Sequence, residues 1–192
     1  MGLPASKQQY TVIEYLALEL DATDKHEFHD GEILAMSGGT YRSSVIAANL
    51  IRRLGNALDG TPCGVSDSNS RVLIASLNRY VYPDLLIVCG APEFDPLDIK
   101  QHTIMNPRVV VEVLSPSTEA YDRGEKFNAY RDVPSLEEYI LIAQDQANVE
   151  SWLRQPAGDW THAAFKTLEA IAKIRCLGIE IPLTDIYARI QL

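Results

Sequence analysis

The sequence contains few cysteines, and their spacing does not suggest a cross-linked or zinc-bound fold. Only three occur, Cys63, Cys89 and Cys176, and none forms a C-x-x-C pair. An odd number of widely spaced cysteines argues against a disulfide framework and a zinc ribbon, and suits a reducing cytoplasm. We therefore expect a cytoplasmic protein in which Cys89 and Cys176, each within an apolar segment, pack in the core.

Long apolar runs and glycine-rich phosphate loops are also missing. No segment is long and apolar enough to cross a bilayer, and residues 1–10 lack the basic and then apolar layout of a secretory signal. Without a phosphate loop, neither a nucleotide-driven motor nor a Rossmann dehydrogenase is expected. The sequence indicates a soluble globular protein that does not associate with a membrane.

An excess of positive charge is absent as well, since the formal net charge is -9. Binding to a polyanion depends largely on lysine and arginine, so the average charge disfavours nucleic acid. The distribution is less unfavourable, because basic residues gather in the middle of the chain. They are Arg42, Arg52, Arg53, Arg71, Arg79, Arg108, Arg123, Lys126 and Arg131.

The spacing of apolar residues predicts strands and helices in alternation, with no linker to divide them. We therefore expect residues 1–192 to form one domain, an α/β or α+β sheet covered by helices. The expected elements are a helix at 11–20, a hairpin about Asp30-Gly31, a helix at 41–58, strands at 70–75, 80–89 and 108–114, a loop at 91–107, a helix at 118–131, strands at 137–143, 147–154 and 159–165, and a short helix after 181.

A proline interrupts one expected strand, at Tyr82-Pro83-Asp84-Leu85. Proline cannot donate a hydrogen bond to a sheet, so Pro83 is confined to an edge, a bulge or a strand start. Such a bend can direct Asp84 away from regular strand pairing. Taken alone, the segment is more simply interpreted as a turn with a solvated carboxylate.

A carboxylate also lies within the nearly continuous apolar strand at 108–114, where Glu112 is part of VVVEVL. An ionised carboxylate in a strand covered on both faces is costly unless it is paired or bound to a metal. Glu112 could instead lie at the open end of the strand, or pair with a core arginine such as Arg71.

The next helix places Asp122, Lys126 and Tyr130 four residues apart, which predicts that they share one face. A solvent-exposed Asp–Lys pair would explain this spacing alone, although Gly124 weakens an exposed helix. Together with Asp84 and Glu112, the lysine suggests a different chemistry. Two carboxylates on neighbouring strands can hold a divalent cation, and a lysine can orient or deprotonate a water that attacks a phosphodiester.

The sequence resembles the Uma-type restriction endonucleases of the PD-(D/E)XK nuclease superfamily. The resemblance runs from about Tyr10 to Arg154 and is carried by HEFHDGEILAMSGG, YVYPDLLIVCG and NPRVVVEVLSPSTEAYDRGEKFNAYRDVPSLEEYILI, of which the third is the most specific. It implies a restriction-endonuclease-like fold, in which helices flank a mixed central sheet. It also implies that Asp84 and Glu112 are metal ligands.

The same resemblance assigns roles to further residues. The usual E-x-K reads Glu112-Val113-Leu114 here, so the resemblance implies that Lys126 in the following helix supplies the lysine. Tyr130, one turn further on, is expected to support Lys126. Glu27 matches the family's glutamate before the Asp-Gly turn and is expected to be a third acid at the metal, directly or through water.

The leading hypothesis is a Mg²⁺- or Mn²⁺-dependent endonuclease that cuts DNA by water attack, with RNA left open as a substrate. By analogy with enzymes that cut both strands, we expect a homodimer. An alternative is a catalytically weak or inactive nucleic-acid-binding or regulatory module. Ser43 and Ser44 stand where relatives carry a histidine, which together with the acidic charge favours that module. A third reading is an inert domain held by a buried Glu–Lys pair.

Two other patterns have simpler explanations. His26 and His29 are three residues apart in an expected strand, so they should face opposite ways, and we expect no zinc site there. Trp152 and Trp160 flank a hairpin turn, where sheet packing is a simpler explanation than stacking on nucleotides.

Overall fold

The computed structural model describes residues 8–36 and 38–192. The N-terminal residues 1–7, for which no secretory signal is expected, and Ser37 beside the Gly-Gly pair lie outside the described residues. The elements in chain order are α1 (Val12–Asp21), β1 (His26–His29), β2 (Glu32–Ala35), α2 (Tyr41–Leu58), β3 (Cys63–Asp67), β4 (Arg71–Ile74), η1 (Ala75–Leu77), β5 (Arg79–Val81), β6 (Leu85–Cys89), β7 (Thr103–Ile104), β8 (Val109–Leu114), α3 (Glu119–Tyr121), η2 (Asp122–Lys126), α4 (Phe127–Tyr130), β9 (Glu138–Ala143), β10 (Asn148–Arg154), β11 (Trp160–Lys166), β12 (Ile171–Ile174), β13 (Ile179–Pro182) and α5 (Leu183–Ile186).

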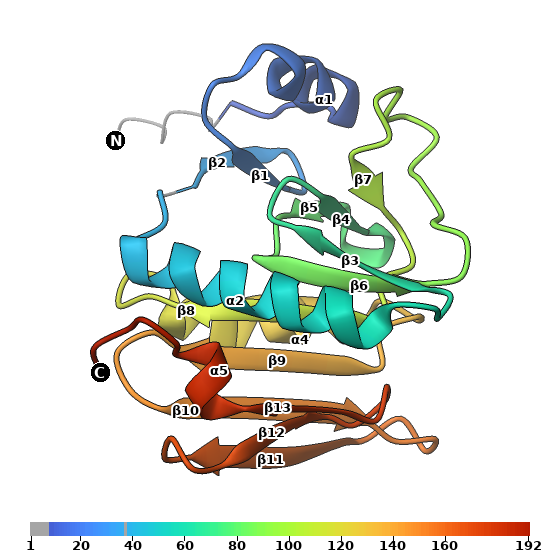
Figure 1. Ribbon diagram of the computed structural model, residues 1–192. Helices are drawn as coiled ribbons and strands as arrows, with labels where there is room; N and C mark the ends of the chain where they lie inside the picture. The colour runs from blue at the N-terminus through green and yellow to red at the C-terminus, as the bar shows by residue number, and fades with distance from the viewer. Residues whose placement is uncertain (1–7, 37) are drawn as a thin grey trace.

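The expected mixture of strands and covering helices is confirmed, but the strands form three sheets. The first has the order β2-β1-β5-β4-β7, the second β11-β10-β9-β8-β6-β3, and the third is the hairpin β12-β13. Figure 1 shows the first sheet stacked above the second, with β12 and β13 in front of β10 and β11. Strands β8 and β9 are parallel, and the helical segment 119–130 is the crossover between them.

The first sheet and α1 form a small layer of their own. Thr11 caps α1 by accepting a hydrogen bond from the Glu14 amide, and the Glu14 carboxylate bonds back to the Thr11 amide. The buried face of α1 packs Tyr15 and Leu16 against Phe28 of β1 and Tyr80 of β5. The opposite face of β1, which carries Glu27 and His29, is left to face other elements.

The chain crosses from the first sheet to the second at Tyr82-Pro83-Asp84. Here the prediction of one continuous strand at 80–89 is wrong, because β5 ends at Val81 and β6 begins at Leu85. Pro83 lies between the two ladders, where its missing amide costs no sheet hydrogen bond. The crossing sets Asp84 at the junction of the two sheets.

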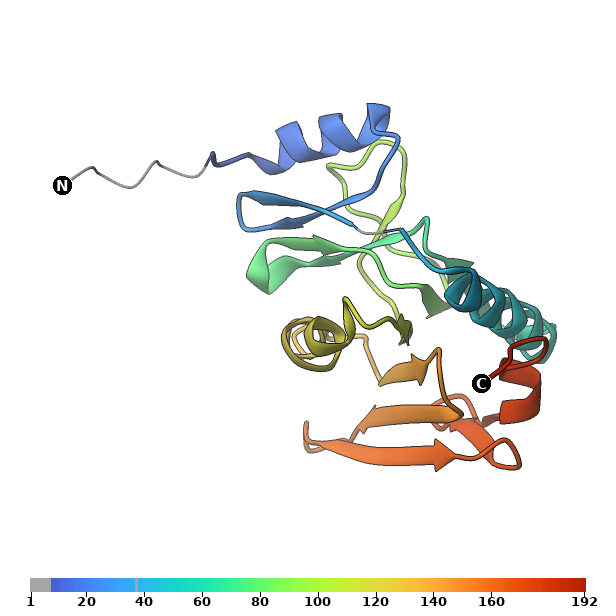
Figure 2. The same ribbon diagram turned by 90° about the vertical axis from the view of Figure 1, so that its left-hand side faces the viewer.

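Two helical segments cover opposite faces of the second sheet, as the view along them in Figure 2 shows. On one face, α2 packs Ile46, Leu50 and Leu54 against alternate residues of β8 and β9. On the other face, Ala129 and Tyr130 of α4 pack against Val110, Leu114 and Tyr139. Glu112 belongs to this second face by alternation along β8.

The crossover helix contains a π-helical turn, η2, between α3 and α4. This turn was not predicted, because a regular 3.6-residue repeat was assumed for 118–131. Gly124 lies in the turn, and a β-carbon there would meet no atom within 4 Å. π turns are rare and are often found at functional sites, and this turn ends at Lys126, a predicted site residue.

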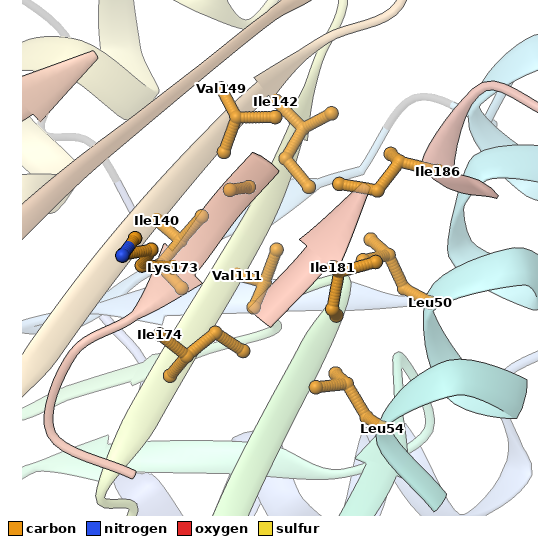
Figure 3. Close-up of a pocket in the computed structure, with 11 residues that line it drawn as sticks. Leu50, Leu54, Val111, Ile140, Ile142, Val149, Lys173, Ile174, Ile181 and Ile186 are labelled. Carbon is orange, nitrogen blue, oxygen red and sulfur yellow. The ribbon is translucent and has the colours of Figure 1, made fainter. Parts of the chain in front are cut away.

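The hairpin β12-β13 and helix α5 close the core on the α2 side. Between them and the second sheet lies a cavity of about 20 Å³, enough for one water molecule. Apart from Lys173 its walls are apolar, as Figure 3 shows, and include Leu50, Val111, Ile140, Ile142 and Ile181. A space of this size and lining reflects imperfect packing in the core.

The prediction that the cysteines remain unpaired is wrong for two of them. Cys63 in β3 and Cys89 in β6 are cross-strand partners and form a disulfide. The strand that carries Cys63 was itself not predicted, so the register that joins the two thiols could not be foreseen. Cys176 is free and packs against the core, as expected.

Within the part of the chain that the structure describes, no helix has the length and apolar character needed to span a membrane.

Candidate active site

Lys126 lies at the centre of a buried polar cluster between the two main sheets. Its ammonium nitrogen is 2.9 Å from Glu112 Oε1 and 3.5 Å from Glu27 Oε1, and it donates a hydrogen bond of 2.9 Å to the Tyr82 carbonyl. The side chain is 5% exposed. Burial lowers the pKa of Lys126, but the surrounding carboxylates, Glu112 first, raise it well above the usual value. The lysine therefore remains a charged donor at neutral pH.

Glu112 reaches this cluster from the middle of β8, and its side chain is 4% exposed. Burial raises the pKa of Glu112 well above its usual value despite the attraction of Lys126, and the like charges of Asp122 and Asp84 raise it further. Of the alternatives open for Glu112, pairing with Arg71 is not what occurs, because Arg71 pairs with Asp98. Burial therefore favours the protonated form of Glu112 unless a further cation lies beside it.

Asp84 lies opposite Glu112, because Leu85 of β6 pairs with Val111 of antiparallel β8. One of its carboxylate oxygens, Oδ2, accepts a hydrogen bond of 2.6 Å from the Val113 amide. Burial raises the pKa of Asp84, although Val113, Lys126 and Lys25 each favour the ionised form. The bend at Pro83 thus brings the two acids together at adjacent strands.

Glu27 enters from β1 and is the most strongly stabilised of the acids. Its Oε1 accepts a hydrogen bond from the Tyr82 amide at 3.1 Å, and its Oε2 accepts one from the Tyr121 hydroxyl at 2.9 Å. Burial opposes ionisation, but Lys126 and hydrogen bonds from His29, Tyr121 and Tyr82 hold the pKa of Glu27 at about 2. Glu27 is therefore a carboxylate at any ordinary pH.

Two residues of the crossover helix complete the cluster. Asp122 Oδ1 is 3.8 Å from the Lys126 nitrogen, and burial raises the pKa of Asp122. Tyr130 is fully buried beneath the cluster, and its hydroxyl has no hydrogen-bond partner among the described residues. The support that Tyr130 is expected to give Lys126 is thus not a hydrogen bond from its hydroxyl.

The negative charge of the cluster exceeds its positive charge. Glu27, Asp84, Glu112 and Asp122 gather around the ammonium of Lys126, with Lys25 also acting on Asp84, and the pKa values of Asp84, Glu112 and Asp122 are raised. Buried carboxylates with raised pKa values bind protons unless a further cation arrives. This imbalance fits a divalent cation between Asp84 and Glu112.

No group of three or more His, Cys, Asp or Glu side chains in residues 8–36 and 38–192 is arranged to hold a metal ion. A cation between Asp84 and Glu112 would therefore take its other ligands from water. That donor set suits Mg²⁺, which keeps several waters and binds through one or two carboxylates.

Four residues around the cluster were not predicted to belong to it. Tyr121 and His29 contact Glu27, Tyr82 contacts Glu27 and Lys126 through its backbone, and Lys25 lies near Asp84. Three of them lie in the same short segments as predicted residues, HEFHDG, YPDL and YDRGEK, and Lys25 directly precedes the first segment. Their contacts join segments far apart in sequence, such as Tyr121 and Glu27, so spacing alone gave no signal.

Comparison with known proteins gives one matching family and several relatives. The Uma2 family, described as "Putative restriction endonuclease", matches residues 12–184. The chain is 36% identical over 175 residues to "Uncharacterized protein slr1290" of Synechocystis sp. (strain ATCC 27184 / PCC 6803 / Kazusa), which covers 91% of this chain and 89% of that protein. It is 35% identical over 159 residues to "Uncharacterized protein sll1609" of the same organism, covering 83% and 88%.

A solved structure has the same fold. It is the crystal structure of "a putative nuclease belonging to DUF820" from Anabaena variabilis ATCC 29413, with a TM-score of 0.70. The match covers 91% of this chain and 97% of that chain at 12% identity. At this identity the likeness concerns the fold alone.

Proposed function

The chain belongs to the Uma2 family, and on that premise we propose that it is a divalent-metal-dependent endonuclease that hydrolyses phosphodiester bonds of DNA. The observation that carries the proposal is that Asp84, directly before β6, lies opposite Glu112 of the neighbouring strand β8, with Lys126 2.9 Å from Glu112. Perturbed carboxylates beside a buried lysine are common at active sites and unusual elsewhere. Residues 1–192 would act as one nuclease domain.

In this proposal Asp84 and Glu112 hold Mg²⁺ or Mn²⁺, with Glu27 reached at most through water. When bound, the cation supplies Lewis acidity and lowers the pKa of water. Its positive charge would also offset the burial that raises the pKa values of the two acids. Both carboxylates would then be ionised at neutral pH.

Lys126 would act as a hydrogen-bond donor and a fixed positive charge. Because the carboxylates keep it protonated, it is poorly suited to remove a proton from water. It can instead orient the attacking water and stabilise the negative charge that develops on the phosphate oxygens. The Tyr82 carbonyl and Glu27 hold the ammonium in place for that role.

The proposed substrate is DNA, with RNA as the other outcome of a substrate test, and the proposed compartment is the cytoplasm. A homodimer would bring two such sites to a duplex, one for each strand. Since the net charge is -9, binding to the polyanion should rely on local cations and on the metal. Cleavage should therefore weaken steeply as salt is raised.

Plasmid nicking with matched variants tests the proposal. We expect wild-type protein with Mg²⁺ or Mn²⁺ to relax supercoiled plasmid, and Asp84→Asn and Lys126→Met to be at least roughly a hundredfold slower. Lys166→Met is the control, because Lys166 is exposed on β11, away from the cluster. Equal nicking by all four proteins would point to a contaminating nuclease and refute the assignment.

A second candidate is a nucleic-acid-binding or regulatory module that has kept the fold without turnover. It is favoured by Ser43 and Ser44, which stand near the start of α2 where relatives are expected to carry a histidine. Calorimetric titration with Mn²⁺ separates the two candidates. Binding of Mn²⁺ that Asp84→Asn abolishes supports the enzyme. An absence of Mn²⁺ binding, together with DNA binding in a separate titration without divalent cation, supports the module.

A further inference from the structure

A closed polar triangle lies on the β1 side of the candidate site. The Tyr121 hydroxyl donates to Glu27 Oε2 at 2.9 Å, while His29 Nε2 is 3.2 Å from that oxygen and 3.2 Å from the Tyr121 hydroxyl oxygen. The Tyr121 and His29 rings stack with centroids 6.1 Å apart. His29 and Glu27 are two residues apart on β1 and so project from the same face.

Hydrogen counting fixes the direction of these bonds. Because the Tyr121 proton is donated to Glu27, the bond between His29 and Glu27 requires a hydrogen on His29 Nε2. The Tyr121 oxygen is then left to accept from that same nitrogen. All three side chains are thereby oriented by one another, with Glu27 as the common acceptor.

Both oxygens of Glu27 are consequently engaged by this chain's own groups. Oε2 receives Tyr121 and His29, and Oε1 receives the Tyr82 amide and lies 3.5 Å from the Lys126 nitrogen. A carboxylate with donors on each oxygen has little capacity left to bind a metal directly. It is well placed to remain the counter-charge of Lys126.

We propose that Tyr121 and His29 are positioning residues that lock Glu27 as a permanent partner of Lys126, so that Glu27 serves the lysine and is not a metal ligand. This inference rests on the proposed function. Lys126 has three carboxylate partners, at 2.9 Å (Glu112), 3.5 Å (Glu27) and 3.8 Å (Asp122), of which Glu112 is also the proposed ligand of the cation. Glu27 keeps the ammonium paired when Glu112 is engaged by the cation.

Lysine positioning predicts a different pattern from metal ligation. If Glu27 is a ligand, its loss weakens the metal, whereas if it serves Lys126, its loss slows turnover and leaves metal binding unchanged. Tyr121→Phe is a selective probe, because it removes the hydroxyl but keeps the ring that stacks on His29 and lies 5.8 Å from the Lys126 nitrogen. His29→Gln keeps a donor nitrogen near the position of Nε2, while His29→Ala removes it.

The first measurement is Mn²⁺ affinity by calorimetry. Glu27→Gln and Tyr121→Phe should bind Mn²⁺ within about threefold of wild type, whereas Glu112→Gln should lose at least roughly tenfold. Comparable losses for Glu27→Gln and Glu112→Gln would make Glu27 a ligand and overturn the proposal. Tyr41→Phe, at an exposed tyrosine that starts α2, is the matched control.

The second measurement is cleavage kinetics. Tyr121→Phe and His29→Ala should lower kcat roughly tenfold with KM within about twofold, and His29→Gln should recover most of the loss. In a Glu27→Gln background, Tyr121→Phe should cause no further decrease, because its effect passes through Glu27. Equal decreases in both backgrounds would overturn the proposal.

The third measurement needs no activity and separates this inference from the proposed function. Urea unfolding is measured for Tyr121→Phe, Lys126→Met and the double variant. The unfolding equilibrium constant of the double variant should differ by roughly threefold or more from the value expected if the two single effects simply multiplied. The deviation should vanish in the Glu27→Gln background. A wild-type protein that neither binds Mn²⁺ nor cuts DNA would refute the nuclease, while independent effects in this cycle would refute the positioning role.

Discussion

Two buried clusters of charge lie in neighbouring parts of the molecule, and they are balanced in opposite ways. The arginine cluster is formed by Arg71 of β4 with Asp98 and Glu19. The lysine cluster is formed by Lys126 with Glu27, Asp84, Glu112 and Asp122. Tyr82 borders both, since its ring lies 5.8 Å from the Arg71 guanidinium and its carbonyl accepts from Lys126.

The Asp98 carboxylate of the arginine cluster is well satisfied, whereas Arg71 Nε and Nη1 are buried with no hydrogen-bond partner among the described residues. Arg71 donates to Asp98 at 2.8 Å, and the same carboxylate accepts from the Thr103 hydroxyl and from the amides of Lys100 and His102. Burial opposes ionisation of Asp98, but hydrogen bonds from Thr103 and Arg71 lower its pKa. The cluster ties the loop at 91–102 to β4.

The lysine cluster is short of positive charge, and the pKa values of Asp84, Glu112 and Asp122 are all raised, by burial first. Such a site costs stability that the rest of the core must offset. The contrast teaches that burial of charge alone does not identify an active site. The informative feature is an imbalance that a ligand of the opposite sign would correct.

The largest expected effect tests that contrast by removing each cation. Arg71→Met should destabilise the protein by about 3–5 kcal/mol, because Asp98 and Glu19 lose their buried partner. Lys126→Met combined with Glu112→Gln and Glu27→Gln should leave the free energy of unfolding unchanged or raise it, because the ammonium is removed together with its two nearest carboxylates. Urea unfolding at pH 7 measures both. A loss of several kcal/mol in the triple variant would mean that the lysine cluster is a structural anchor like the other.

The next effect separates the acids within the lysine cluster by the sign of their pH dependence. The pKa of Glu27 is about 2 against a usual 4.5, so its contribution is present above pH 4.5 and is lost as pH falls toward 2. The advantage of wild type over Glu27→Gln should therefore shrink by roughly 3 kcal/mol between pH 7 and the acid limit.

Glu112 provides the opposite trend in the same experiment. Its pKa is raised, so its contribution is present below pH 4.5 and is lost as pH rises through the raised value. Glu112→Gln should therefore be more stable relative to wild type at pH 7 than at pH 4. Urea midpoints of the three proteins from pH 3 to pH 8 give both trends, and trends of equal sign would contradict the assignment.

A third effect asks which cluster responds to a divalent cation. At a Mn²⁺ concentration a hundred times the dissociation constant, wild type should gain about 2.7 kcal/mol. The gain should persist in Asp98→Asn, although that variant starts from lower stability, and should be absent in Asp84→Asn. Thermal unfolding with and without Mn²⁺ measures each gain. Retention of the gain in Asp84→Asn would move the metal to another place.

The elements that the sequence predicted well are those with strong local signals. Helix α2 has the predicted bounds, because Val45, Ile46, Leu50, Leu54 and Leu58 form one apolar stripe. The Asp30-Gly31 turn fixed the β1-β2 hairpin, with positive φ at both residues. By contrast, β3, β7 and the β12-β13 hairpin are short and weakly patterned, and they owe their pairing to tertiary neighbours.

The site was predictable in its parts and less so in its arrangement. The sequence alone predicts Asp84, Glu112 and Lys126 as site residues, and the structure brings them together at one junction of two sheets. The roles of Tyr121 and His29 depend on contacts across more than ninety residues, for which sequence spacing carries no signal. The π turn that delivers Lys126 was equally hidden, since it breaks the helical period on which the prediction relied.

The smallest effect compares one buried tyrosine from the surroundings of each cluster. Tyr80 donates to Asp95 Oδ2 at 2.7 Å, so Tyr80→Phe should cost about 1–2 kcal/mol, because a buried acceptor loses its donor. The Tyr130 hydroxyl is buried with no partner in the described residues, so Tyr130→Phe should be neutral or stabilising by up to about 1 kcal/mol. Urea unfolding of both variants provides the comparison. A loss of stability in Tyr130→Phe equal to that in Tyr80→Phe would mean that the Tyr130 hydroxyl is hydrogen-bonded in solution.

The rate of cleavage by Tyr130→Phe adds a second comparison. If this variant gains stability while cleavage slows, the unsatisfied hydroxyl beside Glu112 and Lys126 lowers the stability of the wild-type protein. Such a loss of stability is expected where a group serves the reaction and not the fold.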